Sequence, residues 1–291
     1  MKFLLSALLF LTFNSLIKPV HASCLVSNVS GHGQPLLLMP GFLSDETVWQ
    51  DVAAEMAKSH QVHQLAIAGF GKNPACDQAE DIFNQALHDV RNYISSNKLN
   101  KPVFIGHSLG GLMAFKLALL QDIELSGAIS VDGLPFIGPV FTRDSRTQVV
   151  DLYHQAESMK NWYQHAHASQ IKMLTQQGVA QQTQLKDKYQ TLVEMAEQSD
   201  PITAGSAIYT VMQTDLRQDL DNLKLPMLLI GAAGGFESKE QQEATRKLYK
   251  AQLNHAKQVT LLMNNQGRHF LMWDEPRWLI HTIKQFIKER I

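Results

Sequence analysis

The fold of this 291-residue chain is decided by the stretch Val103-Phe104-Ile105-Gly106-His107-Ser108-Leu109-Gly110-Gly111. The apolar run at its start predicts a buried strand, and the apolar pattern from Leu112 to Leu120 predicts a helix. A strand that passes through Gly-x-Ser-x-Gly directly into a helix is the context of a nucleophile elbow, in which glycines let strand and helix approach and the serine is strained. The stretch therefore predicts that the Ser108 hydroxyl projects from the end of a sheet strand.

On both sides of this stretch, short apolar runs alternate with longer amphipathic ones. The expected strands are Leu36–Met39, Val62–Ile67, Val103–Ile105, Ala128–Val131, Met227–Ile230 and Val259–Met263. The expected helices are Thr47–Lys58, Asp81–Ser95, Leu109–Gln121 and Ser238–His255. Strands and helices in alternation favour an α/β fold, with a mainly parallel central sheet and helices on both faces.

One segment interrupts the alternation. Between about Phe141 and Asp219 no clear strand appears, and this is roughly eighty residues, which is long for a single crossover connection. We therefore expect a helical cap at 140–219, inserted before the penultimate core strand, and a core made of 23–139 and 220–291. The cap aromatics Tyr153, Trp162 and Tyr163 are candidates to line a pocket under it.

Composition and charge exclude several classes of function. Apolar residues make up 45% and charged residues 18%, as in globular proteins. Lys and Arg together number 26 and Asp and Glu 27, so no basic surplus indicates nucleic acid or an anionic membrane as a partner. No Gly-x-Gly-x-x-Gly motif and no cluster of metal ligands is present in the sequence, so we expect neither a metal nor another cofactor.

The first 22 residues have the pattern of a secretory signal. Lys2 provides a positive start, Phe3–Ile17 is mostly apolar, and Val20-His21-Ala22 provides small residues around a cleavage site. A retained membrane anchor is the alternative, but the apolar run contains polar residues and is shorter than the ~20 residues that a spanning helix needs. No later segment resembles a membrane span. We expect a periplasmic or secreted protein, in which Cys24 and Cys76 either form a disulfide or remain free thiols.

Two backbone amides are candidates to stabilise an oxyanion beside the serine. The Leu109 amide lies at the predicted start of a helix, directly after Ser108. The second candidate is the Phe42 amide, because the predicted strand Leu36–Met39 runs at once into a glycine-containing turn that can face the elbow.

A serine hydroxyl is a weak nucleophile until a base accepts its proton, and a histidine is the usual base. Among the twelve histidines, His269 follows the last predicted strand, at the sheet edge where open α/β folds place reactive groups. His107 lies directly before Ser108, but its side chain is expected to point away from the serine, because neighbouring residues of a strand face opposite sides. We therefore expect it to pack or to line the pocket.

These residues resemble the α/β-hydrolase superfamily, in particular its capped esterase and lipase-like branch, over nearly the whole chain after residue 22. The matching pieces are Pro40-Gly41-Phe42, Gly106–Gly111, Asp215-Leu216-Arg217 and His269-Phe270. The resemblance implies the order serine, acid, histidine along the chain and a helical cap in its middle. We expect Asp215 to pair with nearby Arg217 or with backbone.

The acid is where this sequence departs from the family. Members commonly carry Asp in the turn after the strand that corresponds to Met227–Ile230, but here that turn reads Gly231-Ala232-Ala233-Gly234-Gly235-Phe236-Glu237. Some members similar to the haloalkane dehalogenases place the acid after the preceding strand, where this chain has Asp132. We predict Asp132 as the acid, with Glu237 as the alternative and a triad without a strong acid as a third possibility.

The resemblance thus implies a serine hydrolase that cleaves a small to medium carboxylic ester, or a lactone, through an acyl-enzyme intermediate. Its partner is a small-molecule ester. Two alternatives use the same fold: an acyltransferase with an alcohol or amine acceptor, and a non-catalytic binding protein that has lost a reactive group.

Overall fold

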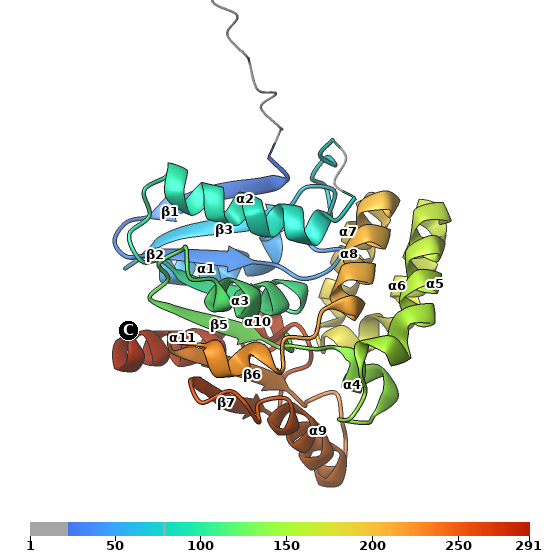
Figure 1. Cartoon of the computed structure of the whole chain (residues 1–291). Coiled ribbons are helices and arrows are strands. Elements are labelled where there is room, and N and C mark those ends of the chain that lie inside the picture. The colour runs from blue at the N-terminus through green and yellow to red at the C-terminus, as the bar shows by residue number, and fades with distance from the viewer. Residues whose placement is uncertain (1–22, 78–79) are drawn as a thin grey trace, which may run out of the picture.

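The computed structural model describes residues 23–77 and 80–291, and in this part of the chain seven strands form one sheet (Figure 1). The sheet order is β1-β3-β2-β4-β5-β6-β7. The strands are β1 Leu25–Gly31, β2 Pro35–Met39, β3 Gln61–Ile67, β4 Val103–His107, β5 Gly127–Val131, β6 Met227–Ala232 and β7 Val259–Asn264. All neighbours pair in parallel except β1 and β3, which confirms the mainly parallel sheet. The predicted signal at 1–22 lies outside the described residues.

The six predicted strands correspond to β2 to β7, but β1 was not predicted. In β1 only Leu25 and Val26 are half-buried and the other positions are exposed. The strand adds antiparallel to the edge of the sheet, with Leu25 opposite Ile67 and Gly31 opposite Gln61. An exposed edge strand lacks the continuous apolar run that marks buried parallel strands, so its sequence carried no clear signal.

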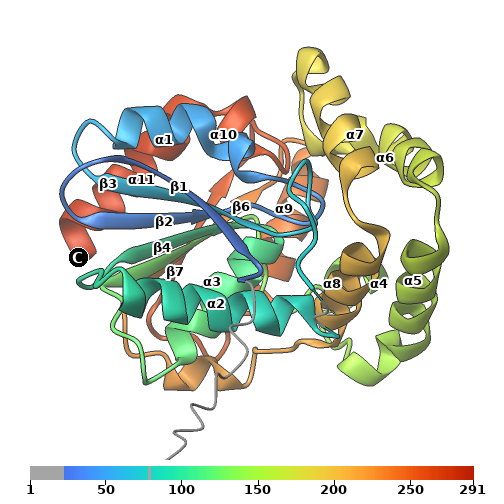
Figure 2. The ribbon, with the colours of Figure 1, turned by 90° about the horizontal axis from the view of Figure 1, so that it is seen from above.

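Helices cover both faces of the sheet, as Figure 2 shows. The covering elements are α1 Gln50–Met56, α2 Ile82–Ser96, α3 Leu109–Leu119, α9 Lys239–Ala251, α10 Leu271–Asp274 and α11 Pro276–Arg290. α1, α10 and α11 lie on one face, and α2 and α3 on the other. Every residue of β2 and β4 is buried, with Leu37 and Phe104 packed in one apolar cluster and Leu36 and Ile105 in the other. Burial on both faces explains why these strands are apolar throughout.

Between β5 and β6 the chain forms the helices that stand together at one end of the sheet (Figure 1). They are α4 Gly138–Thr142, η2 Val149–Leu152, α5 Tyr153–His165, α6 Ala168–Gln182, α7 Tyr189–Gln198 and α8 Pro201–Gln213. We call this group the cap. The start of α8 is attached to the core because the Asp200 amide donates a 2.7 Å hydrogen bond to the Gly69 carbonyl. Ser206 Oγ likewise donates to the Glu80 carbonyl at 2.9 Å.

A disulfide joins Cys24 to Cys76, whose Cα atoms are 5.2 Å apart. The structure thus has the paired form of the two alternatives that the sequence left open. The disulfide connects the residue just before β1 to the loop that follows β3. Across 23–77 and 80–291, the structure contains no helix with the length and apolarity that a membrane span requires.

Candidate active site

The turn between β4 and α3 presents Ser108. Ser108 has a φ of +53°, in a region that side chains rarely adopt. A Cβ placed on Gly106 would lie 1.8 Å from the Gly110 carbonyl oxygen, so the strand and the helix approach this closely only because the position carries no side chain. The amide of Ser108 donates a 2.9 Å hydrogen bond to the Val131 carbonyl at the end of β5. The structure therefore holds Ser108 in a sharp turn at the carboxyl end of the sheet.

Asp132 is adjacent to Ser108 because β4 and β5 are parallel neighbours. His107 pairs with Val131 in the register of the two strands, so the next residues of both strands leave the sheet side by side. Asp132 also has a positive φ, +52°, and its amide donates to the Ile230 carbonyl at 2.7 Å. The backbone thereby fixes the carboxylate at the same sheet edge as the serine.

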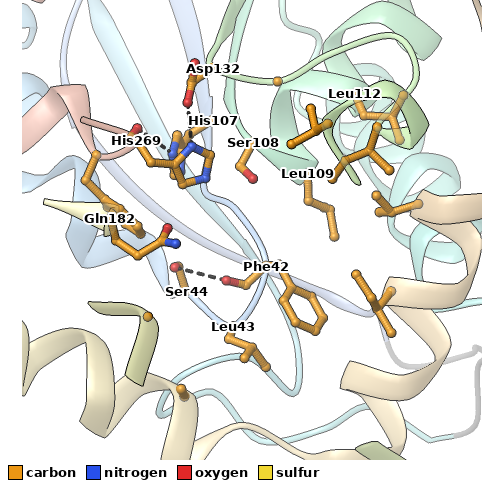
Figure 3. Close-up of a pocket in the computed structure, with 18 of the residues that line it drawn as sticks. Phe42, Leu43, Ser44, His107, Ser108, Leu109, Leu112, Asp132, Gln182 and His269 are labelled. Carbon is orange, nitrogen blue, oxygen red and sulfur yellow. Dashed lines mark hydrogen bonds and ion pairs between the residues drawn. The ribbon is translucent and has the colours of Figure 1, made fainter. Parts of the chain in front are cut away.

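The Asp132 carboxylate accepts three hydrogen bonds. His269 Nδ1 donates to Oδ2 at 2.6 Å, and the Ala232 amide and the Tyr249 hydroxyl each donate to Oδ1 at 2.7 Å. Only 9% of the Asp132 side chain is exposed. Because Nδ1 keeps its proton and donates it in a hydrogen bond to the carboxylate, Nε2 of neutral His269 is free to accept another proton. Figure 3 shows Asp132, His269 and Ser108 grouped in this order.

Tyr249 is a site residue that the sequence did not reveal. It lies on α9 and is buried, and its burial, followed by the charge of Asp132 and the hydrogen bond to it, raises the pKa of Tyr249 well above 10.0. The hydroxyl therefore stays protonated and continues to donate to the carboxylate. Its position resembles any buried position of an amphipathic helix, so no sequence pattern distinguishes it.

His107 packs against His269 and forms a hydrogen bond to its backbone. Its ring is 1% exposed, and Nε2 donates a 3.0 Å hydrogen bond to the His269 carbonyl. Burial, with a smaller effect of neighbouring His269, moves the pKa of His107 well below 6.5, so His107 is neutral. Its Nδ1 is buried and forms no hydrogen bond within the described part of the chain. The ring centroids of His107 and His269 are 4.4 Å apart, so His107 both packs against the site and lines it.

The loop after β2 passes directly over the elbow. A Cβ on Gly41 would lie 2.9 Å from Ser108 Cβ and 3.0 Å from His107 Nδ1, so this close passage requires glycine. It brings Phe42 to the cavity that Ser108 and Leu109 also line (Figure 3). Neither the Phe42 amide nor the Leu109 amide donates a hydrogen bond to any residue that the structure describes. Both predicted oxyanion donors are thus unengaged.

Ser108 and His269 open into one cavity of about 470 Å³ between the core and the cap. Its walls are mainly apolar, with Leu109 and Leu112 from α3 and Tyr163, Leu192, Ile208 and Val211 from the cap. Ser44, Thr175 and Gln182 add polar groups. Within the described residues, the Ser108 hydroxyl forms no hydrogen bond, so it is free to rotate toward a substrate carbonyl. A small to medium apolar acyl group suits such a cavity.

Of the three cap aromatics that were candidates to line the pocket, Tyr163 does so. It packs edge-on against Phe42, with ring centroids 5.3 Å apart. Tyr153 and Trp162 are 45% and 38% exposed and are absent from the cavity wall. Helical spacing alone could not tell which face of α5 is turned toward the core.

The remaining acidic candidates lie elsewhere. Glu237 is exposed in the segment between β6 and α9 and, in the part of the chain described, has no hydrogen bond or ion pair with His269. The structure therefore does not support the alternative acid. Asp215 forms an ion pair with Arg217 at 2.6 Å, as expected. No group of three or more His, Cys, Asp or Glu side chains in 23–77 and 80–291 is arranged to hold a metal ion.

Solved structures with the same fold include α/β-hydrolases, esterases and lactonases. MenH from S. aureus superposes with a TM-score of 0.73 at 17% identity, covering 93% of this chain and 99% of that one. The enol-lactonase from Burkholderia xenovorans LB400 superposes with a TM-score of 0.69 at 14% identity, covering 92% of this chain and 100% of that one. These likenesses confirm the α/β-hydrolase fold.

Comparison of sequences gives the family. A protein of Vibrio atlanticus (strain LGP32) named pimeloyl-[acyl-carrier protein] methyl ester esterase is 24% identical over 215 residues, which cover 72% of this chain and 80% of that protein. A protein of the same name from Vibrio vulnificus (strain YJ016) is 24% identical over 208 residues, 71% of this chain and 78% of that protein. The Hydrolase_4 family model, described as serine aminopeptidase, S33, matches residues 32–276, and the chain therefore belongs to this family of α/β-hydrolases.

Proposed function

We propose that the protein hydrolyses small to medium carboxylic esters, with Ser108 as nucleophile, His269 as base and Asp132 as the acid that orients His269. The observation that carries this proposal is the 2.6 Å contact between Asp132 and His269 at the cavity that contains Ser108. The fold, the family and the esterase names of its relatives support an ester hydrolase.

In the first half of the reaction, Ser108 Oγ attacks the ester carbonyl carbon while its proton passes to His269 Nε2. The carbonyl oxygen becomes negatively charged, and the Phe42 and Leu109 amides donate to it. The bond from the carbonyl carbon to the alcohol oxygen then breaks, and His269 returns its proton to that oxygen. The alcohol leaves and the acyl group remains esterified to Ser108.

In the second half, a water molecule loses a proton to His269 Nε2 as its oxygen attacks the acyl carbon. The bond to Ser108 Oγ breaks and His269 returns the proton to that oxygen, so the free acid and the original enzyme are formed. Asp132 stabilises the protonated His269 in both halves, and Tyr249 and the Ala232 amide hold the carboxylate in place.

The test is a panel of p-nitrophenyl esters from acetyl to dodecanoyl, together with simple lactones and the matched p-nitroanilides. We expect hydrolysis of the esters with an optimum at intermediate chain length, because the 470 Å³ cavity is apolar and closed by the cap. The Ser108→Ala variant is the control. Turnover that is equal in both proteins, or confined to the anilides, would overturn the proposal.

The same panel separates the two alternatives. An acyltransferase would give acylated product in preference to free acid when a competing alcohol or amine is added. A non-catalytic binding protein would show no Ser108-dependent turnover. The sequence lacks an acid at the family's usual place, which favoured a binding protein, whereas the 2.6 Å contact between Asp132 and His269 favours a hydrolase.

We propose further that the protein is exported to the periplasm or beyond the cell. The support is the signal-like pattern of 1–22 together with the Cys24–Cys76 disulfide, since disulfides persist mainly in oxidising compartments. The test is the mass of the protein recovered outside the cytoplasm of its host. A chain that begins at Ser23 is expected, whereas an uncleaved cytoplasmic chain would contradict the proposal.

A further inference from the structure

A second cavity, of about 740 Å³, adjoins the first on the side of His269. The two cavities have Asp132, Val140, Tyr249 and His269 in common as lining residues. The second extends from there toward α9 and the turn after β6, away from Ser108 and the oxyanion donors, which line only the first. The two cavities are therefore neighbours at His269.

Three cationic side chains line the second cavity: Arg143, Lys247 and Arg268. None of them forms an ion pair with a carboxylate in the described part of the chain. Asp132 is the one acidic residue in the wall, and its oxygens already accept from His269, Tyr249 and the Ala232 amide. The wall therefore carries three cationic side chains against one carboxylate, so its net charge is positive.

Hydrogen bonds to the end of α6 hold the Arg268 side chain in place. Its Nη1 donates to the carbonyl oxygens of Ala180 and Thr183 at the end of α6. Its Nε is buried and has no partner among the described residues. On the opposite wall, the Arg143 guanidinium lies over the Phe236 ring, 5.8 Å from its centroid. Guanidinium groups fixed in this manner are suited to carboxylate and phosphate oxygens.

The turn after β6 creates the space. Ala232 at the end of β6 and Gly235 in the turn line the second cavity, and neither has a side chain large enough to fill it. The usual carboxylate of the family is absent from this turn, and Glu237, the acid at its end, is exposed and does not line the second cavity. With Asp132 as the acid, the second cavity beside His269 is thus left open and positively charged.

The positions of Ser108 and His269 decide which part of an ester faces the second cavity. The acyl carbonyl must lie in the first cavity, next to Ser108 and the amides of Phe42 and Leu109. The alcohol part must lie next to His269, which returns the proton to it. We propose, on the basis of the function proposed above, that the second cavity binds a carboxylate or phosphate carried by the alcohol part of the substrate.

The test compares three butanoate esters of alcohols of similar size: 3-hydroxypropanoate, 2-hydroxyethyl phosphate and the neutral 3-hydroxypropanamide. We expect kcat/KM to be roughly tenfold higher for at least one anionic ester than for the amide, with the preference declining at high salt. The anion that shows the preference identifies carboxylate or phosphate as the source. The Arg143→Gln/Lys247→Gln protein is expected to lose this preference, so that its kcat/KM for the anionic esters is no higher than for the amide.

Arg246→Gln is the matched control, since Arg246 is on α9 beside Lys247, pairs with Glu243 and is absent from the cavity wall. Equal rates for charged and neutral esters in the unaltered protein, or the same loss in the control, would overturn the inference. Hydrolysis of the neutral ester would still stand in that case and would leave the proposed function intact. If no ester is hydrolysed, calorimetric binding of the anionic esters to the Ser108→Ala protein decides the inference separately, and affinity that is independent of Arg143 and Lys247 would contradict it.

Discussion

Asp132 and His269 are 137 positions apart in the sequence, yet Oδ2 of one accepts a 2.6 Å hydrogen bond from Nδ1 of the other. The contact forms because Asp132 directly follows β5 beside the elbow and His269 follows β7 at the same edge of the sheet. The turn after β6, where the family usually carries the acid, begins beyond Ala232, whose amide donates to Asp132. A displaced carboxylate thus occupies the position that orients the histidine.

The Asp132→Asn substitution tests this relationship. An amide in place of the carboxylate favours the wrong His269 tautomer and no longer stabilises its protonated form, so we expect kcat to fall by about 10³- to 10⁴-fold with residual activity retained. Steady-state kinetics on a p-nitrophenyl ester measure the loss. Glu237→Gln is the matched control and is expected to leave kcat unchanged; a larger loss in that variant would reassign the acid.

The Tyr249→Phe substitution tests whether the Tyr249 hydroxyl holds the Asp132 carboxylate in place. The substitution removes one of the two donors to Asp132 Oδ1 and keeps the aromatic packing. We expect kcat to fall roughly tenfold with KM unchanged, because Asp132 would be less well fixed while the substrate pocket keeps its shape. A rise in KM with unchanged kcat would instead show that Tyr249 acts on substrate binding alone.

The elbow could be predicted from the sequence because its signal is local. Gly106, Ser108 and Gly110 are contiguous with the strand and the helix that they connect, and steric limits at these positions leave few other backbone arrangements. Strands β2, β4 and β6 were predictable for the same reason, since each contains a short, buried apolar run. His269 was identified from its place after the last of these runs.

The remaining features depend on the pairing of distant segments. The sequence offered Asp132 and Glu237 as acids, and only the position of β5 beside β4 distinguishes them. Tyr249 is separated from Asp132 by 117 positions, and nothing in its own helix indicates a hydrogen bond to a carboxylate. The cationic residues of the second cavity likewise come from three segments: the cap, α9 and the loop before His269.

The low pKa of buried His107 predicts a pH-dependent stability. Below about pH 6.5 the unfolded chain takes up a proton at this residue that the folded protein does not, so the free energy of unfolding falls as the pH falls. One such group contributes at most about 1.4 kcal/mol per pH unit. Denaturant unfolding of the His107→Gln variant, in which the amide can still donate to the His269 carbonyl, is expected to show a shallower decline between pH 6.5 and the folded pKa. An identical decline would show that His107 is not the group responsible.

The disulfide between Cys24 and Cys76 closes a loop with a sequence separation of 52. Loss of this cross-link in the Cys24→Ala/Cys76→Ala protein is expected to lower the free energy of unfolding by up to about 4 kcal/mol, because the unfolded chain gains entropy. Both cysteines are remote from the lining of the catalytic cavity, so kcat should be unchanged at temperatures where the variant is folded. An unchanged unfolding midpoint would contradict a stabilising role.

The most direct test of the account is the site at which a fluorophosphonate becomes attached. The reagent reacts with serine hydroxyls that a neighbouring base activates. Peptide mapping by mass spectrometry is expected to find one adduct, on Ser108, with labelling abolished in Ser108→Ala and strongly slowed in Asp132→Asn. An adduct on another residue, or ester turnover that continues without modification of Ser108, would contradict the assignment of Ser108 as the nucleophile.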